Sequence, residues 1–127
     1  MSLTIVDLQA CADATAEYLR KITTHPKAVR VPSVRITTAC RGFARSTYLT
    51  IPSWALARTE DYAIYYVVHE VTHYFTGPGH GLAFKHLEQN ALAQWDLFPV
   101  YSRVYPRTLK NGAGDVVYHK TNENIRP

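Results

Sequence analysis

Cysteine is scarce in this chain of 127 residues, which contains only Cys11 and Cys40. The two do not form a C-x-x-C pair, and no further cysteine completes the ligand set of a zinc ribbon. Small secreted domains that depend on disulfides usually carry more cysteines than this. We therefore expect both thiols to behave as small buried apolar groups, and we expect a reducing, cytoplasmic setting.

Long hydrophobic runs are also lacking. No stretch approaches 18 apolar residues without a charge, which argues against a membrane-spanning helix. The first residues have no basic region and Asp7 interrupts their apolar run, so no signal peptide is predicted. A hydrophobic content of 46% with 19% charged residues is typical of a globular protein. We predict one domain over residues 1–127, with a frayed tail at about 121–127.

Basic residues are nearly missing from the middle of the chain. Residues 61–100 contain one Lys or Arg against four Asp or Glu, whereas residues 1–60 contain eight against four and residues 101–127 five against two. Positive flanks can contact phosphate, which predicts weak nucleic-acid binding that falls as salt rises. The alternative is that these charges only solvate the surface of a small domain with a net charge of +4.

Three segments have the pattern of amphipathic helices without internal Gly or Pro, namely residues 4–23, 60–76 and 81–95. In the second, Thr59 suits an N-cap and Gly77-Pro78-Gly79 a stop. Its apolar stripe is formed by Ile64, Val68, Val71 and Phe75. Residues 52–55 are expected to form a short helical turn.

Two segments, 34–38 and 47–51, alternate apolar and polar residues and are rich in β-formers. Residues 41–44 between them suit a hairpin, which predicts an antiparallel pair. A second candidate pair joins residues 100–105 and 115–119 across a turn at 111–114. The whole is a small α+β domain, in which a short antiparallel sheet packs against two or three helices.

The second helical segment contains His69-Glu70-Val71-Thr72-His73, an H-E-x-x-H sequence that arises by chance in about one of a hundred chains of this composition. Residues four apart share a helix face, so both imidazoles can reach one ion. The alternative is a pair of unrelated histidines on the surface or in the core. A catalytic zinc takes three protein ligands and a water. Glu70 lies about 100° around the helix from His69, where it can take a proton from that water. The pattern predicts a zinc hydrolase with Glu70 as general base.

A third ligand must come from outside the motif. The metzincin pattern needs Gly and His three and six residues after the second motif histidine, but Thr76 and Gly79 occupy those places. His80 follows one residue later with glycine on both sides, which lets the backbone turn back toward the metal. Glu88 is the alternative, as a carboxylate ligand from the third helical segment, and His86 is a weaker candidate.

The motif followed by Gly79-His80-Gly81-Leu82-Ala83-Phe84 resembles the SprT/Spartan-type zinc metallopeptidases, whose pattern is H-E-x-x-H, a loop of variable length, then G-H-G-x-x-F. The resemblance covers roughly residues 45–90. It implies a minimal zincin-like fold, in which a short antiparallel sheet packs on the active-site helix and one or two further helices. It also implies a Zn²⁺ ion held by His69, His73 and His80, with Glu70 as general base.

Longer members of this family carry a C-terminal zinc ribbon with paired cysteines, but no cysteine follows Cys40 here. No DNA-binding module is recognisable either. The DNA–protein-crosslink substrate associated with Spartan therefore does not carry over on the resemblance alone, and the positive flanks keep it open as an alternative.

The sequence thus predicts a zinc metallopeptidase that acts on a protein or peptide. One alternative is a zinc hydrolase that cleaves nucleic acid or a non-protein amide with the same metal and base. Another is a non-catalytic binding module stabilised by zinc, although structural zinc sites are usually rich in cysteine. The oxyanion of the reaction needs a stabilising group besides the metal, and Tyr101, Arg103 and Tyr105 are candidates.

Overall fold

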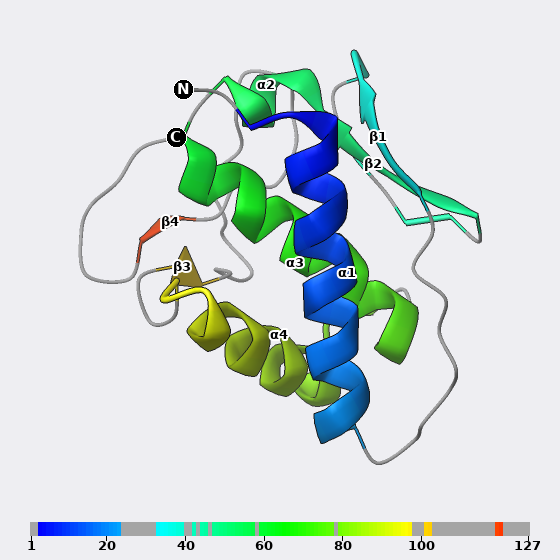
Figure 1. Ribbon diagram of the computed structural model, residues 1–127. Coiled ribbons are helices and arrows are strands. Elements are labelled where there is room, and N and C mark those ends of the chain that lie inside the picture. The colour runs from blue at the N-terminus through cyan, green and yellow to red at the C-terminus, as the bar shows by residue number, and fades with distance from the viewer. Residues whose placement is uncertain are drawn as a thin grey trace.

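A computed structural model describes residues 3–23, 33–39, 42, 44–45, 47–57, 59–77 and 79–97, and the backbone of two short strands at 101–102 and 119–120. Figure 1 shows long helices that cross, a further helix below them and a small sheet at one side. In chain order the elements are α1 (Ile5–Ile22), β1 (Ser33–Thr37), β2 (Tyr48–Pro52), α2 (Ser53–Leu56), α3 (Glu60–Thr76), α4 (Leu82–Gln94), β3 (Tyr101–Ser102) and β4 (His119–Lys120).

The three long helices occupy the segments that the sequence predicts, and local hydrogen bonds set where two of them begin. Thr4 caps α1 in a reciprocal capping box, in which the Asp7 carboxylate accepts from the Thr4 N–H at 2.8 Å. Thr59 caps α3, since its hydroxyl accepts from the Tyr62 N–H at 3.0 Å. The N-cap predicted for the motif helix is confirmed. None of the described helices is long and apolar enough to cross a membrane.

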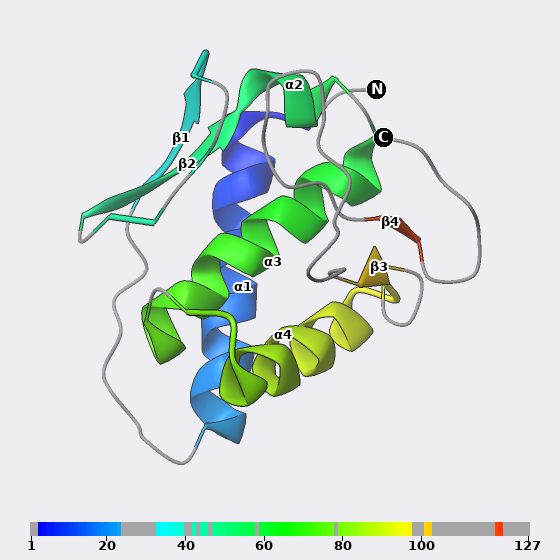
Figure 2. The ribbon, with the colours of Figure 1, turned by 180° about the vertical axis from the view of Figure 1, so that it is seen from behind.

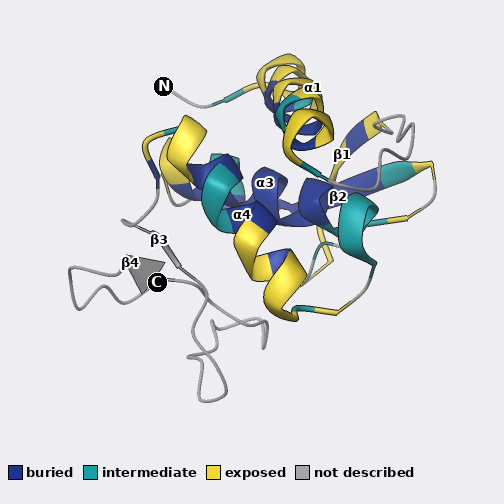
Figure 3. Ribbon diagram, turned by 90° about the horizontal axis from the view of Figure 1, so that it is seen from below, coloured by how far each residue is buried: buried dark blue, intermediate teal, exposed yellow. Residues whose placement is uncertain are grey.

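Helix α3 lies at the centre of the molecule, where α1, α2, α4 and β2 all contact it. Figure 3 shows α3 buried along most of its length, whereas the outer faces of α1 and α4 are exposed. The single apolar stripe predicted from sequence is therefore too narrow a description. Tyr62, Tyr65 and Val67 are buried as well as Val68 and Val71.

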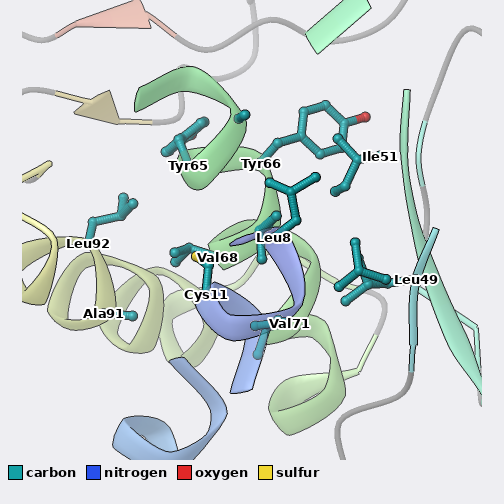
Figure 4. Packing of buried hydrophobic residues seen from close by; sticks show 14 of the residues in the cluster. Leu8, Cys11, Leu49, Ile51, Tyr65, Tyr66, Val68, Val71, Ala91 and Leu92 are labelled. Atoms are coloured by element: carbon teal, nitrogen blue, oxygen red, sulfur yellow. The ribbon is translucent and has the colours of Figure 1, made fainter. Parts of the chain in front are cut away.

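The core forms where α1, α3, α4 and β2 meet. Figure 4 shows residues of all four elements converging there, with β2 on one side of α3 and α4 on the other. The members that are 0% exposed include Leu8 of α1, Leu49 and Ile51 of β2, Val68 and Val71 of α3, and Leu92 of α4. Their burial is the main source of stability in a domain of this size.

Cys11 of α1 belongs to this core and is a free thiol, as the sequence predicts. Burial raises the pKa of the Cys11 thiol to about 12, because the thiolate would lose its hydration. This side chain therefore acts as a small apolar group. Cys40 lies outside the described residues.

Strands β1 and β2 pair in parallel, from Ser33 opposite Tyr48 to Thr37 opposite Pro52. The prediction of an antiparallel pair was wrong for these two strands, although helices and strands do combine in an α+β arrangement. A parallel pair cannot be joined by a tight hairpin, so the connection between the strands crosses over.

The reason for the error is the position of the turn. The sequence places a hairpin at residues 41–44, but the turn lies later, where the Arg45 N–H donates to the Tyr48 carbonyl at 2.8 Å. This turn brings Ala44 into an antiparallel bridge with Leu49. Leu49 pairs with Val34 of β1 on its other side, so β1 occupies the opposite edge of β2.

The two short strands β3 and β4 are antiparallel, with Tyr101 opposite Lys120 and Ser102 opposite His119. Strand β3 lies within the first of the two late segments that the sequence expects to pair, and β4 overlaps the second, 115–119, at His119. The turn predicted at 111–114 and the tail predicted at 121–127 lie outside the described residues.

Gly42 approaches β2 and α3 too closely for any side chain. A Cβ at this position would lie 2.1 Å from the Thr50 carbonyl oxygen. We expect Gly42→Ala to lower the free energy of unfolding by about 1–3 kcal/mol, because the backbone must move to relieve the overlap. Urea denaturation measures this. Gly79→Ala is the matched control, since a Cβ there meets nothing within 4 Å. Equal stability of the two variants would contradict the close approach.

Candidate metal centre

The H-E-x-x-H motif occupies the final turns of α3, after which the chain passes through residues 77–81 into α4. Figure 2 shows this helix–loop–helix unit, in which the loop joins the end of α3 to the start of α4. Because the two helices pack against each other and share this short loop, side chains from α3, the loop and α4 converge at one place.

His69, His73 and His80 meet at this junction. One ring nitrogen from each lies within 4.8 Å of the others, so the three residues are close enough to hold a metal ion. The Nε2 atoms of His69 and His80 are 3.3 Å apart. Two nitrogens bound tetrahedrally to zinc at about 2.0–2.1 Å would be about 3.3–3.4 Å apart. This pair therefore has the separation of one edge of a zinc tetrahedron.

Two of the three imidazoles are held through the nitrogen that faces away from the cluster. His69 Nδ1 lies 2.7 Å from the Glu88 carboxylate, and His73 Nδ1 lies 2.8 Å from the Gly77 carbonyl. A carbonyl or carboxylate oxygen accepts, so Nδ1 carries the hydrogen in both rings. In the neutral rings the lone pair is then on Nε2, which is the tautomer that a metal requires.

Gly77 both ends α3 and orients the second histidine. Its N–H donates to the His73 carbonyl at 2.8 Å, and its own carbonyl accepts from His73 Nδ1. Its backbone has φ +88° and ψ −169°, a conformation that residues with a side chain adopt only under strain. The predicted stop of the motif helix is therefore confirmed, and it has a second role that the sequence does not reveal.

Phe84 of α4 supports all three histidines. Its ring centroid lies 5.0 Å from that of His69, 4.7 Å from that of His73 and 4.9 Å from that of His80. The side chain is 1% exposed. It closes one side of the cluster to water and limits the rotation of the three rings.

Glu70 is buried, and it shares a face of α3 with Tyr74, which is four residues further on. Burial raises the pKa of the Tyr74 phenol to about 12, and the negative charge of Glu70 adds to this rise, so the two groups are close. The Tyr74 hydroxyl donates to the backbone carbonyls of Arg45 and Tyr48. Tyr74 thus fastens the turn before β2 to the face of α3 that carries Glu70.

The donor set suits a metal that prefers nitrogen. Neutral imidazoles bind zinc, copper, iron or nickel, whereas magnesium and calcium prefer oxygen. Among the described residues these three histidines are the one such group. The structure brings His80 to the other two, while Glu88 lies on the opposite nitrogen of His69. His86 is exposed on α4 and outside the group.

Other candidates from the sequence are not placed by the structure. Arg103 and Tyr105 lie outside the described residues, and only the backbone of Tyr101 is described. The sequence does not reveal the contacts of Glu88 and Tyr74, because their partners lie 19 and 26 residues away. The Gly77 contact with His73 is local, but it depends on the unusual backbone conformation of Gly77. The position of Glu88 could have been inferred from its spacing. Phe84 of the second motif and Glu88 are four residues apart and so share a helix face, which directs both side chains to the same site.

Comparison with protein-family models, with curated proteins and with solved structures gives no match to this chain.

The Tyr74 contact gives a prediction for stability. Tyr74→Phe removes the hydroxyl that holds the turn, and we expect it to lower the free energy of unfolding at neutral pH by about 1 kcal/mol. The folded pKa of about 12 exceeds the usual value of 10.0, so the neutral phenol favours the folded state below pH 10. This advantage should decline between pH 10 and 12.

Urea denaturation of both proteins at pH 8 and pH 11 measures this difference. Tyr18→Phe in α1 serves as the control for loss of a phenol. A Tyr74→Phe variant as stable as the wild type at pH 8 would show that the turn is held by other contacts.

Proposed function

We propose that this protein is a zinc-dependent metallopeptidase. The observation that carries the proposal is the junction of three imidazoles, two of them held through Nδ1 so that Nε2 faces the cluster, together with a buried glutamate from the same motif. Three protein ligands leave a coordination position for water, which is the composition of catalytic rather than structural zinc sites.

His69, His73 and His80 would hold the ion. An ion held there would supply Lewis acidity, which would lower the pKa of a water toward 7 and polarise the scissile carbonyl. Glu70 accepts a proton from the attacking water as the water oxygen bonds to the carbonyl carbon. It then returns that proton to the amine nitrogen as the carbon–nitrogen bond breaks. Burial of Glu70 to 5% exposure keeps this carboxylate among fixed dipoles instead of bulk water.

We also propose a relationship to the SprT-type metallopeptidases and to the minimal zincin-like fold. Its support is the two motifs, H-E-x-x-H and G-H-G-x-x-F, whose histidines and phenylalanine pack together. A protein or peptide is the proposed substrate. Weak nucleic-acid binding through the basic flanks stays a prediction, since many of those charges lie outside the described residues.

The binding-module alternative explains the buried glutamate poorly. A structural site does not need a buried carboxylate of the motif as a proton acceptor, whereas a hydrolase does. A nuclease or amidase would use the same residues, and only the substrate separates it from a peptidase.

The first prediction concerns metal content. Purified protein should bind about one zinc per chain, and His80→Ala should lose most of it because two ligands remain. Elemental analysis after dialysis measures the content. His86→Ala, at an exposed histidine outside the cluster, should keep its zinc. Full zinc in His80→Ala would refute the ligand assignment.

The second prediction concerns the general base. Glu70→Gln preserves shape and zinc but cannot accept a proton, so hydrolysis of a labelled unfolded protein should fall at least about 10²-fold. Glu60→Gln, at an exposed position in the first turn of α3, is the matched control and should leave the rate unchanged. Undiminished hydrolysis in Glu70→Gln would exclude the proposed role.

The peptidase proposal fails if neither the wild type nor Glu70→Gln cleaves any peptide although both bind zinc. These two proteins should then be assayed on nucleic acid and on small amides.

A further inference from the structure

Glu88 is a carboxylate within an otherwise apolar helix face. It is 3% exposed, and the other buried residues of α4 are Phe84, Leu87, Ala91 and Leu92. Removing a carboxylate from water is strongly unfavourable unless it is paired and hydrogen-bonded, so a leucine would fit this face more readily. The presence of a charge here has to be explained by what it contacts.

The contact is with the first ligand of the cluster. Glu88 Oε2 lies 2.7 Å from His69 Nδ1, and the two side chains are 4% and 7% exposed. A hydrogen bond to a charged acceptor in a shielded place is short and directional. It holds the ring with Nε2 directed to the side where Nε2 of His80 lies 3.3 Å away.

We propose that Glu88 is a positioning residue for the metal, which fixes the His69 ring and sets the metal affinity through the charge it places on Nδ1. This inference rests on the proposed function, since it takes the three histidines as the ligands. An acceptor with full negative charge makes the imidazole a stronger donor at Nε2. His73 has a neutral backbone carbonyl in the same place, so its ring is oriented without this gain.

The charges of the site support the same role. Three neutral imidazoles leave both positive charges of a divalent ion uncompensated. Among the described residues the buried carboxylates are two, namely Glu88, which contacts His69, and Glu70, which belongs to the same motif as His69. Glu88 offsets part of the ion's charge from behind His69, so it takes up no coordination position. The open position that hydrolysis needs is thereby preserved.

The test measures zinc affinity by competition with a chromophoric chelator in the wild type, Glu88→Gln and Glu88→Ala. Glu88→Ala should keep one zinc per chain but bind it about 10–100-fold more weakly. Glu88→Gln should fall between, because its amide oxygen still accepts from Nδ1 but carries no charge. In the cobalt-substituted proteins the visible absorption bands should shift in Glu88→Ala, since the ring is no longer fixed.

Leu87→Ala is the matched control, because it removes a buried side chain from the same face of α4 and leaves the Glu88 carboxylate in place. Its zinc affinity should equal that of the wild type while its stability falls, and circular dichroism confirms that each apoprotein is folded. If Glu88→Ala binds zinc as tightly as the wild type, the positioning role is wrong although the site stands.

Loss of zinc from Glu88→Ala as complete as from His80→Ala would instead make Glu88 a ligand and overturn the inference. A wild type that binds no zinc would remove the proposed function itself, and the inference with it.

Discussion

Helix α3 cannot rotate about its own axis without exposing part of the core, and every feature of the metal centre depends on that. Successive residues are about 100° apart around a helix, so a rotation by one position would put Val68 or Glu70 where His69 stands. Tyr65, Val67 and Val68 are 0% exposed, and at about 100° per residue they lie on different sides of the helix. A helix that is buried along one stripe could tilt and rotate by small amounts. A helix that is buried on several sides is fixed in one orientation about its axis.

The centre itself is built from a short stretch of chain. The three histidines, the phenylalanine behind them and Glu88 all fall within residues 69–88, in two helices and the loop that joins them. Two longer-range contacts hold this unit in place. Tyr74 ties α3 to the turn before β2, and the indole of Trp95 donates to Thr15 of α1 at 3.2 Å. Metal binding and folding should therefore be linked, since an ion that binds only the assembled junction stabilises it.

The sequence predicts the helices and the three histidines because their signals are local. Capping residues, an apolar period and motif spacing are all read within one turn or one loop. Strand direction is different. Both strands were recognised, but whether β1 meets β2 in parallel depends on which edge of β2 the turn at Arg45 leaves open, and no local pattern encodes that. The roles of Glu88 and Tyr74 are hidden for the same reason, as their partners lie 19 and 26 residues away.

Gly77 is restricted by its backbone conformation and not by the space around it. A Cβ added there would meet nothing within 4 Å, so space does not prevent a larger residue. The obstacle is handedness, because φ +88° and ψ −169° mirror an extended conformation that ordinary residues adopt freely. A protein made by chemical synthesis with D-alanine at this position would keep the backbone unstrained, and the carbonyl that orients His73 would stay where it is. L-alanine would have the same volume and composition, yet it would pull that carbonyl away from the ring.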